Sequence, residues 1–275
     1  MKLGVIIPIT DDIDSEFKQV HDLGFPTCQL NGWKPAFFTD DTARQVTAAS
    51  RKYGVEITAF WCGWEGPAVW DFNDGPLTLG LVPPAFRHDR LKILLKGADF
   101  AVKIGVKDLV THVGFIPENP NDPEYKSLVA VLRYLAAYCR QRGLFFLFET
   151  GQETPVTLLR AIEDIGLDNV GVNLDPANLI LYGKANPVDA LDVIGRYVRG
   201  VHAKDGLYPT SGRYLGQETP LGAGKVNLPA LVAKLKAVGY DGALTIEREI
   251  TGEQQVKDIR MAKSLLEALI QENTK

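Results

Sequence analysis

The chain has little cysteine, no excess of basic residues and no long hydrophobic run. Its three cysteines, Cys28, Cys62 and Cys139, are widely spaced without a CxxC pair, which argues against a disulfide framework and fits reduced thiols in a cytoplasmic protein. The formal net charge of −4 argues against a nucleic-acid binder that relies on a basic face. No segment approaches the roughly 18 apolar residues of a membrane span. The short apolar run at the N-terminus, interrupted by Pro8 and followed by acids, predicts a first strand and not a signal peptide.

What the chain does have is a regular alternation of short apolar runs and amphipathic helical windows. With 275 residues, 45% of them hydrophobic, it can build a sizeable core. Several helical windows end on a glycine just before the next apolar run, as a helix-to-strand turn requires. The expected strands are 3–8, 27–30, 55–61, 107–113, 144–149, 170–175, 198–204 and 242–247, and the expected helices are 14–23, 40–53, 88–104, 124–142, 155–165, 187–196, 227–238 and 252–271.

Eight strand–helix units in about 275 residues match the size of a (β/α)8 TIM barrel, which we predict as a single domain over residues 1–275. An open, doubly wound sheet is the alternative, but no GxGxxG follows the first strand, 3–8. The one long connection, residues 62–87, is rich in Gly, Pro and Trp and follows the third strand. Because barrel enzymes keep their sites on the C-terminal face, we expect this loop to lie over the site.

Four polar residues fall at the ends of the last four predicted strands. Residues 144–148 are all apolar, which is typical of a strand buried on both faces, yet this strand ends on Glu149. Asp175, His202 and Glu247 hold similar positions on the next three strands. Three carboxylates on one rim repel each other, and a divalent cation would compensate them. This oxygen-rich set with one imidazole suits Mn²⁺, Mg²⁺ or Co²⁺ better than a structural zinc.

Each of these residues also has a purely structural explanation. A strand-end Glu is commonly solvated or paired with a basic neighbour, and Glu247 stands beside Arg248. Asp175 precedes Pro176 and could cap a turn, and His202 could be a satisfied core histidine. Independent explanations of this kind would not place all four residues at equivalent strand ends. We therefore favour a shared metal site.

Aromatic residues near the same rim are candidates for substrate binding. His112 ends the fourth predicted strand, where it would bind a substrate hydroxyl or pack in the core. Trp33, Trp61 and Trp64 stand at or after the ends of the second and third strands. They could wall a sugar pocket by stacking on C–H faces, or simply pack.

Two charged or Gly-rich segments offer weaker signals. Lys204 could neutralise an enediolate or pair with its neighbour Asp205. The turn GAGKVN, residues 222–227, could bind phosphate through its backbone N–H groups. Such turns before helices are commonplace, so we expect an unphosphorylated sugar or polyol-derived ketone instead.

Five motifs resemble those of sugar isomerases and epimerases of the xylose isomerase-like barrel superfamily, and together they span much of the chain. They are FET (148–150), NLDPAN (173–178), GVHAKDG (200–206), PLGAGKVN (220–227) and GYDGALTIERE (239–249). The resemblance implies that Glu149, Asp175, His202 and Glu247 hold a divalent metal, often Mn²⁺. In the ketose 3-epimerase branch, it implies further that the two glutamates are the acid/base pair.

The chain departs from the ketose 3-epimerase pattern at two positions. Three residues after the metal-binding Asp, those epimerases carry a second His, whereas this chain has Asn178. A few residues beyond the metal-binding His they carry an Arg, whereas this chain offers Lys204 and Asp205. The HxKD form is common in the wider superfamily, including inosose dehydratase-like proteins. The resemblance thus implies the metal site, with Asn178 and Lys204 as further substrate-binding candidates.

The function we predict is a divalent-metal-dependent sugar isomerase or epimerase acting on an unphosphorylated ketose or polyol-derived ketone. Proton removal next to a carbonyl needs a stabilised enediolate, and epimerisation needs a base on each face of the carbon. Aldose–ketose isomerisation through a cis-enediol or a hydride shift could use the same groups. The alternatives are an inosose dehydratase-like lyase, an endonuclease IV-like phosphodiesterase, which the four histidines and the negative charge argue against, and a barrel that binds metal without catalysis. The expected partner is a small sugar or polyol, with no nucleic acid and no membrane, and homo-oligomers are compatible by analogy.

Overall fold

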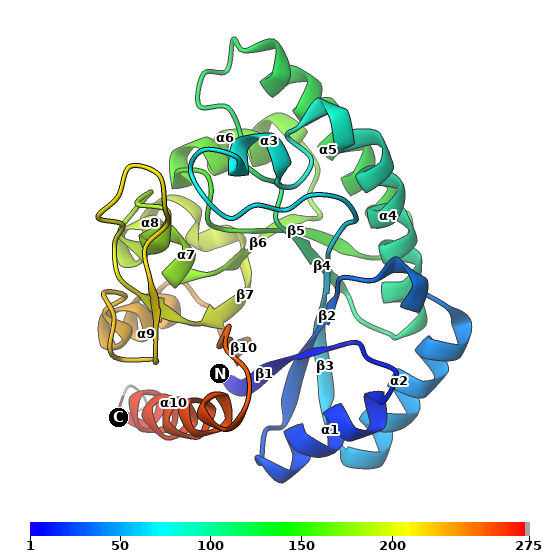
Figure 1. Cartoon of the computed structure of the whole chain (residues 1–275), viewed down its shortest axis with the longest axis vertical. Helices are drawn as coiled ribbons and strands as arrows, with labels where there is room; N and C mark the ends of the chain where they lie inside the picture. The colour runs from blue at the N-terminus through cyan, green and yellow to red at the C-terminus, as the bar shows by residue number, and fades with distance from the viewer. Residues whose placement is uncertain (273–275) are drawn as a thin grey trace.

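Eight parallel strands close into a barrel in the computed structural model, which describes residues 1–272 (Figure 1). Around the barrel the order is β1-β10-β7-β6-β5-β4-β3-β2, so that each strand pairs with the next along the chain and β10 returns to β1. The predicted (β/α)8 fold is confirmed; of the predicted domain limits, residues 273–275 lie outside the described residues. The strands are β1 (Lys2–Pro8), β2 (Thr27–Gly32), β3 (Glu56–Cys62), β4 (Asp108–Thr111), β5 (Phe145–Glu149), β6 (Val170–Leu174), β7 (Val198–Ala203) and β10 (Ala243–Ile246).

Helices surround the barrel, and every predicted helix is present with its ends shifted by a few residues (Figure 1). The largest shift is in α4, which begins at Pro84 and not at residue 88, because a proline is favoured in the first helical turn. The long helices are α1 (Ile13–Asp22), α2 (Asp40–Tyr53), α4 (Pro84–Lys103), α5 (Pro123–Arg140), α6 (Pro155–Ile165), α8 (Pro187–Ile194), α9 (Leu228–Ala237) and α10 (Glu253–Glu272). Among residues 1–272, none of the helices combines the length and apolar character that a membrane crossing requires.

The short elements are the part of the fold that the sequence patterns did not predict, because they are too brief to show a period. Four strands also end earlier than expected: β4 at Thr111, β6 at Leu174, β7 at Ala203 and β10 at Ile246. His112, Asp175 and Glu247 therefore follow their strands directly. The additional elements are η1 (Pro35–Phe37), α3 (Gly75–Thr78), α7 (Pro176–Leu181), η2 (Gly195–Tyr197), β8 (Asp205–Gly206) and β9 (Glu218–Thr219).

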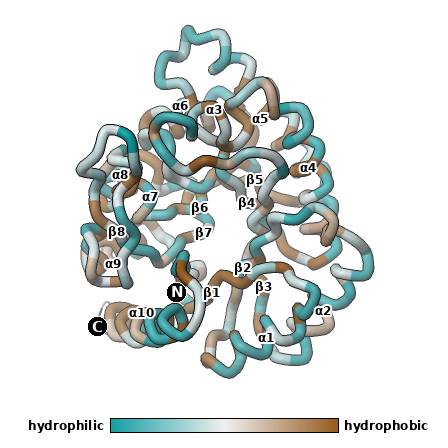
Figure 2. Tube along the Cα trace, viewed as in Figure 1, coloured by the Kyte–Doolittle hydropathy of each residue, from teal (hydrophilic) through white to brown (hydrophobic). Residues whose placement is uncertain are grey.

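The alternation of side chains along β5 explains why an apolar strand ends on a carboxylate. Phe146 and Phe148 belong to the large core that joins the strands to the helices, whereas Leu147 packs with Trp61 in a separate cluster of the barrel interior. Because successive side chains point to opposite faces of a strand, Glu149 falls on the same side as Leu147. Figure 2 shows the hydrophobic stretches along the strands and more hydrophilic segments in the outer loops.

Two buried arginines of α4, Arg87 and Arg90, hold the long connection after β3 in place, and Arg90 makes more of the contacts. The side chain of Arg90 is only 1% exposed, and it also lies 5.3 Å from the ring of Trp64. Burial lowers the pKa of Arg90 to about 10, so the guanidinium stays charged at neutral pH. Its N–H groups donate to four backbone carbonyls of the loop, those of Glu65, Pro67, Thr78 and Gly80.

Replacing Arg90 by Met is expected to lower the free energy of unfolding by about 3 kcal/mol, because four backbone carbonyls lose a charged donor at once. The loop over residues 63–83 should then be cut faster by chymotrypsin. Urea unfolding and timed proteolysis measure both effects. Arg44→Met, on an exposed side chain of α2, is the control and should change stability by less than about 0.5 kcal/mol. Equal behaviour of the two variants would contradict this role of Arg90.

Candidate active site and metal centre

The four residues predicted to share a metal converge at the C-terminal end of the barrel. One ligand atom from each of Glu149, Asp175, His202 and Glu247 lies within 4.8 Å of those of the other three. The Nδ1 atom of His202 is central to the group: it lies 3.2 Å from Glu149 Oε1, 3.2 Å from Glu247 Oε2 and 3.7 Å from Asp175 Oδ2. The cluster joins residues from four separate strand–helix units.

Three atoms of this cluster are buried without a hydrogen-bond partner. They are Asp175 Oδ2, His202 Nδ1 and Glu247 Oε2, which make only ion-pair contacts. Buried polar atoms are nearly always hydrogen-bonded, so three that converge on one point indicate a place for another group. Carboxylate oxygens with one imidazole nitrogen form a donor set that fits a divalent cation such as Mn²⁺ or Mg²⁺.

Asp175 has both of the roles that its sequence context suggested. Its Oδ1 atom accepts the backbone N–H of Asn178 at 2.9 Å and so caps α7. Its Oδ2 atom remains free to face His202 and Lys204. The turn-capping explanation therefore does not exclude a ligand role, because the two oxygens of one carboxylate act separately.

A residue that the sequence analysis missed, Gln29, keeps a proton on Nε2 of His202. The Nε2 atom of His202 lies 2.7 Å from Gln29 Oε1, and Gln29 Nε2 donates to Asn173 Oδ1 at 3.4 Å. An amide oxygen only accepts, so Nε2 carries the proton and Nδ1 faces the carboxylates. Burial lowers the pKa of His202, but Glu247 and Glu149 raise it, and the net pKa lies well above its usual value. A polar residue within the apolar strand TCQL was the signal in the sequence.

Lys204 lies against the cluster and not against Asp205, which corrects one of the two predictions for this lysine. Its Nζ atom lies 3.2 Å from Glu247 Oε2, 3.1 Å from Glu249 Oε1 and 3.5 Å from Asp175 Oδ2. Burial lowers the pKa of Lys204, but Glu247 and the other carboxylates raise it well above the usual value. The lysine is therefore a fixed positive charge beside the candidate ligands.

Asp205 organises the Gly-rich turn before α9. Its Oδ1 accepts the N–H groups of Gly206 and Val226, and its Oδ2 accepts those of Gly222 and Gly224, all at 2.9 to 3.1 Å. These N–H groups are therefore occupied within the protein. The turn has no free set of donors for a phosphate, in agreement with the expectation of an unphosphorylated substrate.

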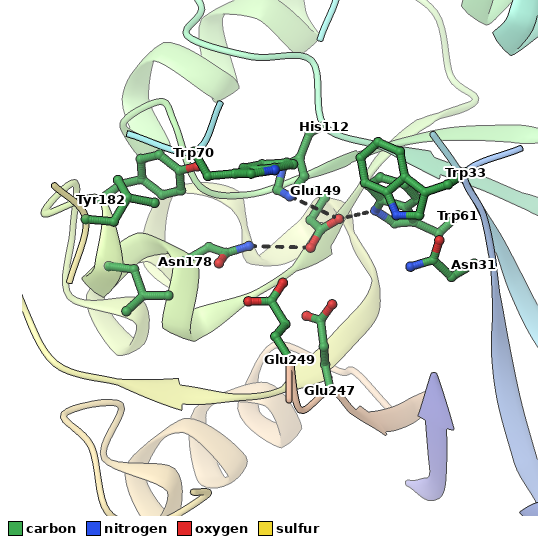
Figure 3. A pocket seen from close by; sticks show the side chains of 12 residues that line it. Asn31, Trp33, Trp61, Trp70, His112, Glu149, Asn178, Tyr182, Glu247 and Glu249 are labelled. Atoms are coloured by element: carbon green, nitrogen blue, oxygen red, sulfur yellow. Dashed lines mark hydrogen bonds and ion pairs between the residues drawn. The ribbon is translucent and has the colours of Figure 1, made fainter. Parts of the chain in front are cut away.

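Glu149 is held in one orientation by three neighbouring side chains (Figure 3). Its Oε2 atom accepts the indole N–H of Trp61 and lies 3.4 Å from His112 Nε2, and its Oε1 atom accepts from Asn178 Nδ2 at 3.4 Å. Burial raises the pKa of Glu149, but His112 and His202 lower it, and the net pKa lies below its usual value. The residue is therefore an ionised carboxylate beside the cluster.

A cavity of about 350 Å³ opens over these residues. It contains the predicted candidates Trp33, Trp61, His112 and Asn178, as well as Glu149 and Glu247 (Figure 3). The predicted candidate Lys204 does not line it. The sequence analysis missed six of the lining residues, because none of the patterns that it used singled them out. They are Asn31, Trp70, Leu181, Tyr182, Leu215 and Glu249.

The fold and its sequence match known proteins over nearly the whole chain. A crystal structure of a xylose isomerase domain protein from Planctomyces limnophilus superposes with a TM-score of 0.94 at 36% identity, over 99% of this chain and 98% of that one. A D-tagatose 3-epimerase-like protein has a TM-score of 0.79 at 20% identity, over 100% and 98% of the two chains.

A further similar structure is a xylose isomerase-like TIM barrel protein from Mycobacterium smegmatis in complex with magnesium, with a TM-score of 0.71 at 18% identity over 99% of this chain and 97% of that one. At such low identities, the last two similarities show the fold alone. The family model for the xylose isomerase-like TIM barrel matches residues 17–268. The chain therefore belongs to the xylose isomerase-like TIM barrel family.

Proposed function

We propose that the protein is a divalent-metal-dependent sugar isomerase or epimerase that acts on an unphosphorylated ketose or polyol-derived ketone. The observation that carries this proposal is the convergence of Asp175 Oδ2, His202 Nδ1 and Glu247 Oε2, buried and without hydrogen bonds, beside the ionised Glu149. The magnesium complex of a similar barrel and the epimerase-like neighbour support it.

Glu149, Asp175, His202 and Glu247 would hold the cation, for which Mn²⁺ is our first choice and Mg²⁺ or Co²⁺ the alternatives. When bound, it would supply positive charge that stabilises negative charge developing on the substrate oxygens. The imidazole of His202 would offer the lone pair of Nδ1 to the cation, because Gln29 keeps the proton on Nε2.

Two carboxylates are placed to move protons on the substrate carbon. Glu149 enters the cavity from one side, and Glu247 comes from the facing side (Figure 3). The ionised carboxylate of Glu149 would remove a proton from the carbon next to the carbonyl. Burial raises the pKa of Glu247, but Lys204 and His202 lower it, and the net pKa lies below its usual value. Glu247 would therefore take up a proton from water before it delivers one on the other face. Trp61 and His112 keep the carboxylate of Glu149 oriented during this transfer.

The charge of the cavity supports an uncharged substrate. Within residues 1–272, no lysine or arginine lines the cavity, whereas Glu149, Glu247 and Glu249 do. A phosphate group would meet acidic side chains there, and the N–H groups of the nearby Gly-rich turn are already taken by Asp205.

The proposal is tested by following a ketose and keto-inositol panel by NMR in D₂O with the Mn²⁺-loaded protein. We expect deuterium at a carbon next to the carbonyl, and its position separates isomerisation from epimerisation at the neighbouring carbon. A product that has lost water would establish the lyase instead. Metal binding without exchange or turnover across the panel would contradict proton transfer as the mechanism.

Replacing Gln29 by Leu is expected to weaken Mn²⁺ binding by about 10- to 100-fold, because the proton of His202 is no longer fixed on Nε2. Isothermal titration calorimetry measures the affinity without any need for substrate. Gln19→Leu, at an exposed position of α1, is the matched control and should bind Mn²⁺ like the parent protein. An unchanged affinity in Gln29→Leu would show that this amide does not position the ligand.

A further inference from the structure

The cavity has two ends of different chemistry. The inner end carries the acidic and amide groups of Glu149, Glu247 and Asn178. The outer end carries Trp33 and Trp70, and each of these side chains is 39% exposed although it lines a cavity. The inner groups suit the reacting ketone, but they do not explain why two indoles are left open to solvent beside it.

The two exposed indoles, Trp33 and Trp70, pack against each other and against further aromatic rings. The ring of Trp33 packs 4.8 Å from that of Trp61 and 5.4 Å from that of Trp64, and both of these are buried. Trp70 meets Trp33 edge to face at 6.5 Å, so the two form a corner. Because Arg90 fixes the loop that carries Trp64 and Trp70, the corner is preformed, and a ligand would meet it without first ordering it.

The loop after β8 also borders the outer end of the cavity. The N–H of Phe72 donates to the carbonyl of Arg213 at 3.0 Å, which joins the loop after β3 to the loop after β8. Leu215 of that second loop lines the same cavity. Apolar groups from three loops thus surround the outer end.

Polar atoms beside the corner indicate a ligand with hydroxyl groups. Asn31 lies next to Trp33 (Figure 3), and its Oδ1 atom is buried without a hydrogen-bond partner. Glu249 offers a carboxylate at the same cavity, and no cation lines it among the described residues. An apolar face with hydroxyl groups at its edge and no charge is the chemistry of a sugar ring. A cavity of about 350 Å³ lies near the lower end of the range of about 300 to 1,000 Å³ that is typical of small-molecule sites. The exposed faces of Trp33 and Trp70 extend the surface available to a ligand beyond it.

We propose that the substrate is a keto-disaccharide or similar glycoside, whose reacting keto-sugar lies at Glu149 and Glu247 while its second, uncharged sugar ring stacks on Trp33 and Trp70. This inference rests on the proposed function for the inner end. It assigns the aromatic corner, with Asn31 at its side, as a second sugar subsite.

The test compares D-fructose with lactulose, turanose and isomaltulose, which carry a second ring at different positions of fructose. Calorimetry on the Mn²⁺-loaded Glu149→Gln variant measures binding without turnover. At least one disaccharide should bind about tenfold more tightly than fructose. Trp33→Ala and Trp70→Ala, in the same background, should remove this preference and leave fructose affinity within about threefold. Trp70→Phe, which retains an aromatic face, should keep most of the preference for the disaccharide.

The control is Tyr134→Ala, at an exposed aromatic of α5 outside the cavity, which should keep the full preference. Disaccharides that bind no better than fructose, or tryptophan variants that weaken fructose as much as the disaccharides, would overturn the subsite. The exchange experiment in D₂O is independent of these affinities. Exchange without a disaccharide preference would remove the subsite alone, and a preference without exchange or turnover would remove the isomerase or epimerase alone.

Discussion

Turnover should fall by about 10²- to 10⁴-fold when Glu149 is replaced by Gln, while the protein stays folded. The amide of Gln has nearly the same shape, and its oxygen can still accept the indole N–H of Trp61. It cannot take a proton from carbon at neutral pH. The loss therefore reports the missing base and not a missing contact.

The measurement is the rate of deuterium incorporation into the substrate, with the Mn²⁺ affinity of the same variant measured beside it. The affinity separates loss of the base from loss of a ligand. Glu153→Gln is the matched control, four residues along the chain. Burial raises the pKa of Glu153 to about 8, so this carboxyl is largely neutral at pH 7 and its replacement by an amide should cost little activity. Parent-like exchange by Glu149→Gln would remove this residue from the reaction.

The fold and the candidate ligands could be predicted because they depend on local patterns. Most strands of the barrel are short apolar runs, and several of the long helices have an amphipathic period that ends near a glycine. A parallel barrel brings the ends of all its strands to one rim, so the positions of Glu149, Asp175, His202 and Glu247 along the chain were enough to place them together.

The missed parts depend on contacts between segments that are far apart in sequence. Gln29 meets His202 across 173 positions, and no local pattern points from one to the other. Trp70 lies in a loop without a period, and it reaches the cavity because Arg90 holds that loop. Lys204 stands beside Asp205 in sequence, but it lies between β7 and β8, where no strand period applies. Its side chain contacts the cluster, whereas that of Asp205 binds the Gly-rich turn.

Lys204→Met is expected to destabilise the metal-free protein by about 3 to 5 kcal/mol. The buried lysine contacts Asp175, Glu247 and Glu249. Among residues 1–272, His202 is then the one remaining ion-pair partner of Asp175 and Glu247. Urea unfolding in EDTA measures the loss. Lys257→Met, at an exposed position of α10, is the control and should lie within about 0.5 kcal/mol of the parent protein.

The same variant should lose less stability in Mn²⁺ than in EDTA, because the cation replaces part of the missing charge. Linkage then requires that Lys204→Met bind Mn²⁺ more tightly than the parent protein, although it is the less stable of the two. The physical reason is that Nζ lies 3.2 Å from Glu247 Oε2 and 3.5 Å from Asp175 Oδ2, so that it repels a cation bound to the same oxygens. If Lys204 stabilised the fold by packing alone, Lys204→Met would lose the same stability in Mn²⁺ and in EDTA, and its Mn²⁺ affinity would be unchanged. Unfolding with and without Mn²⁺, together with calorimetry, therefore decides whether these carboxylates form one cation site.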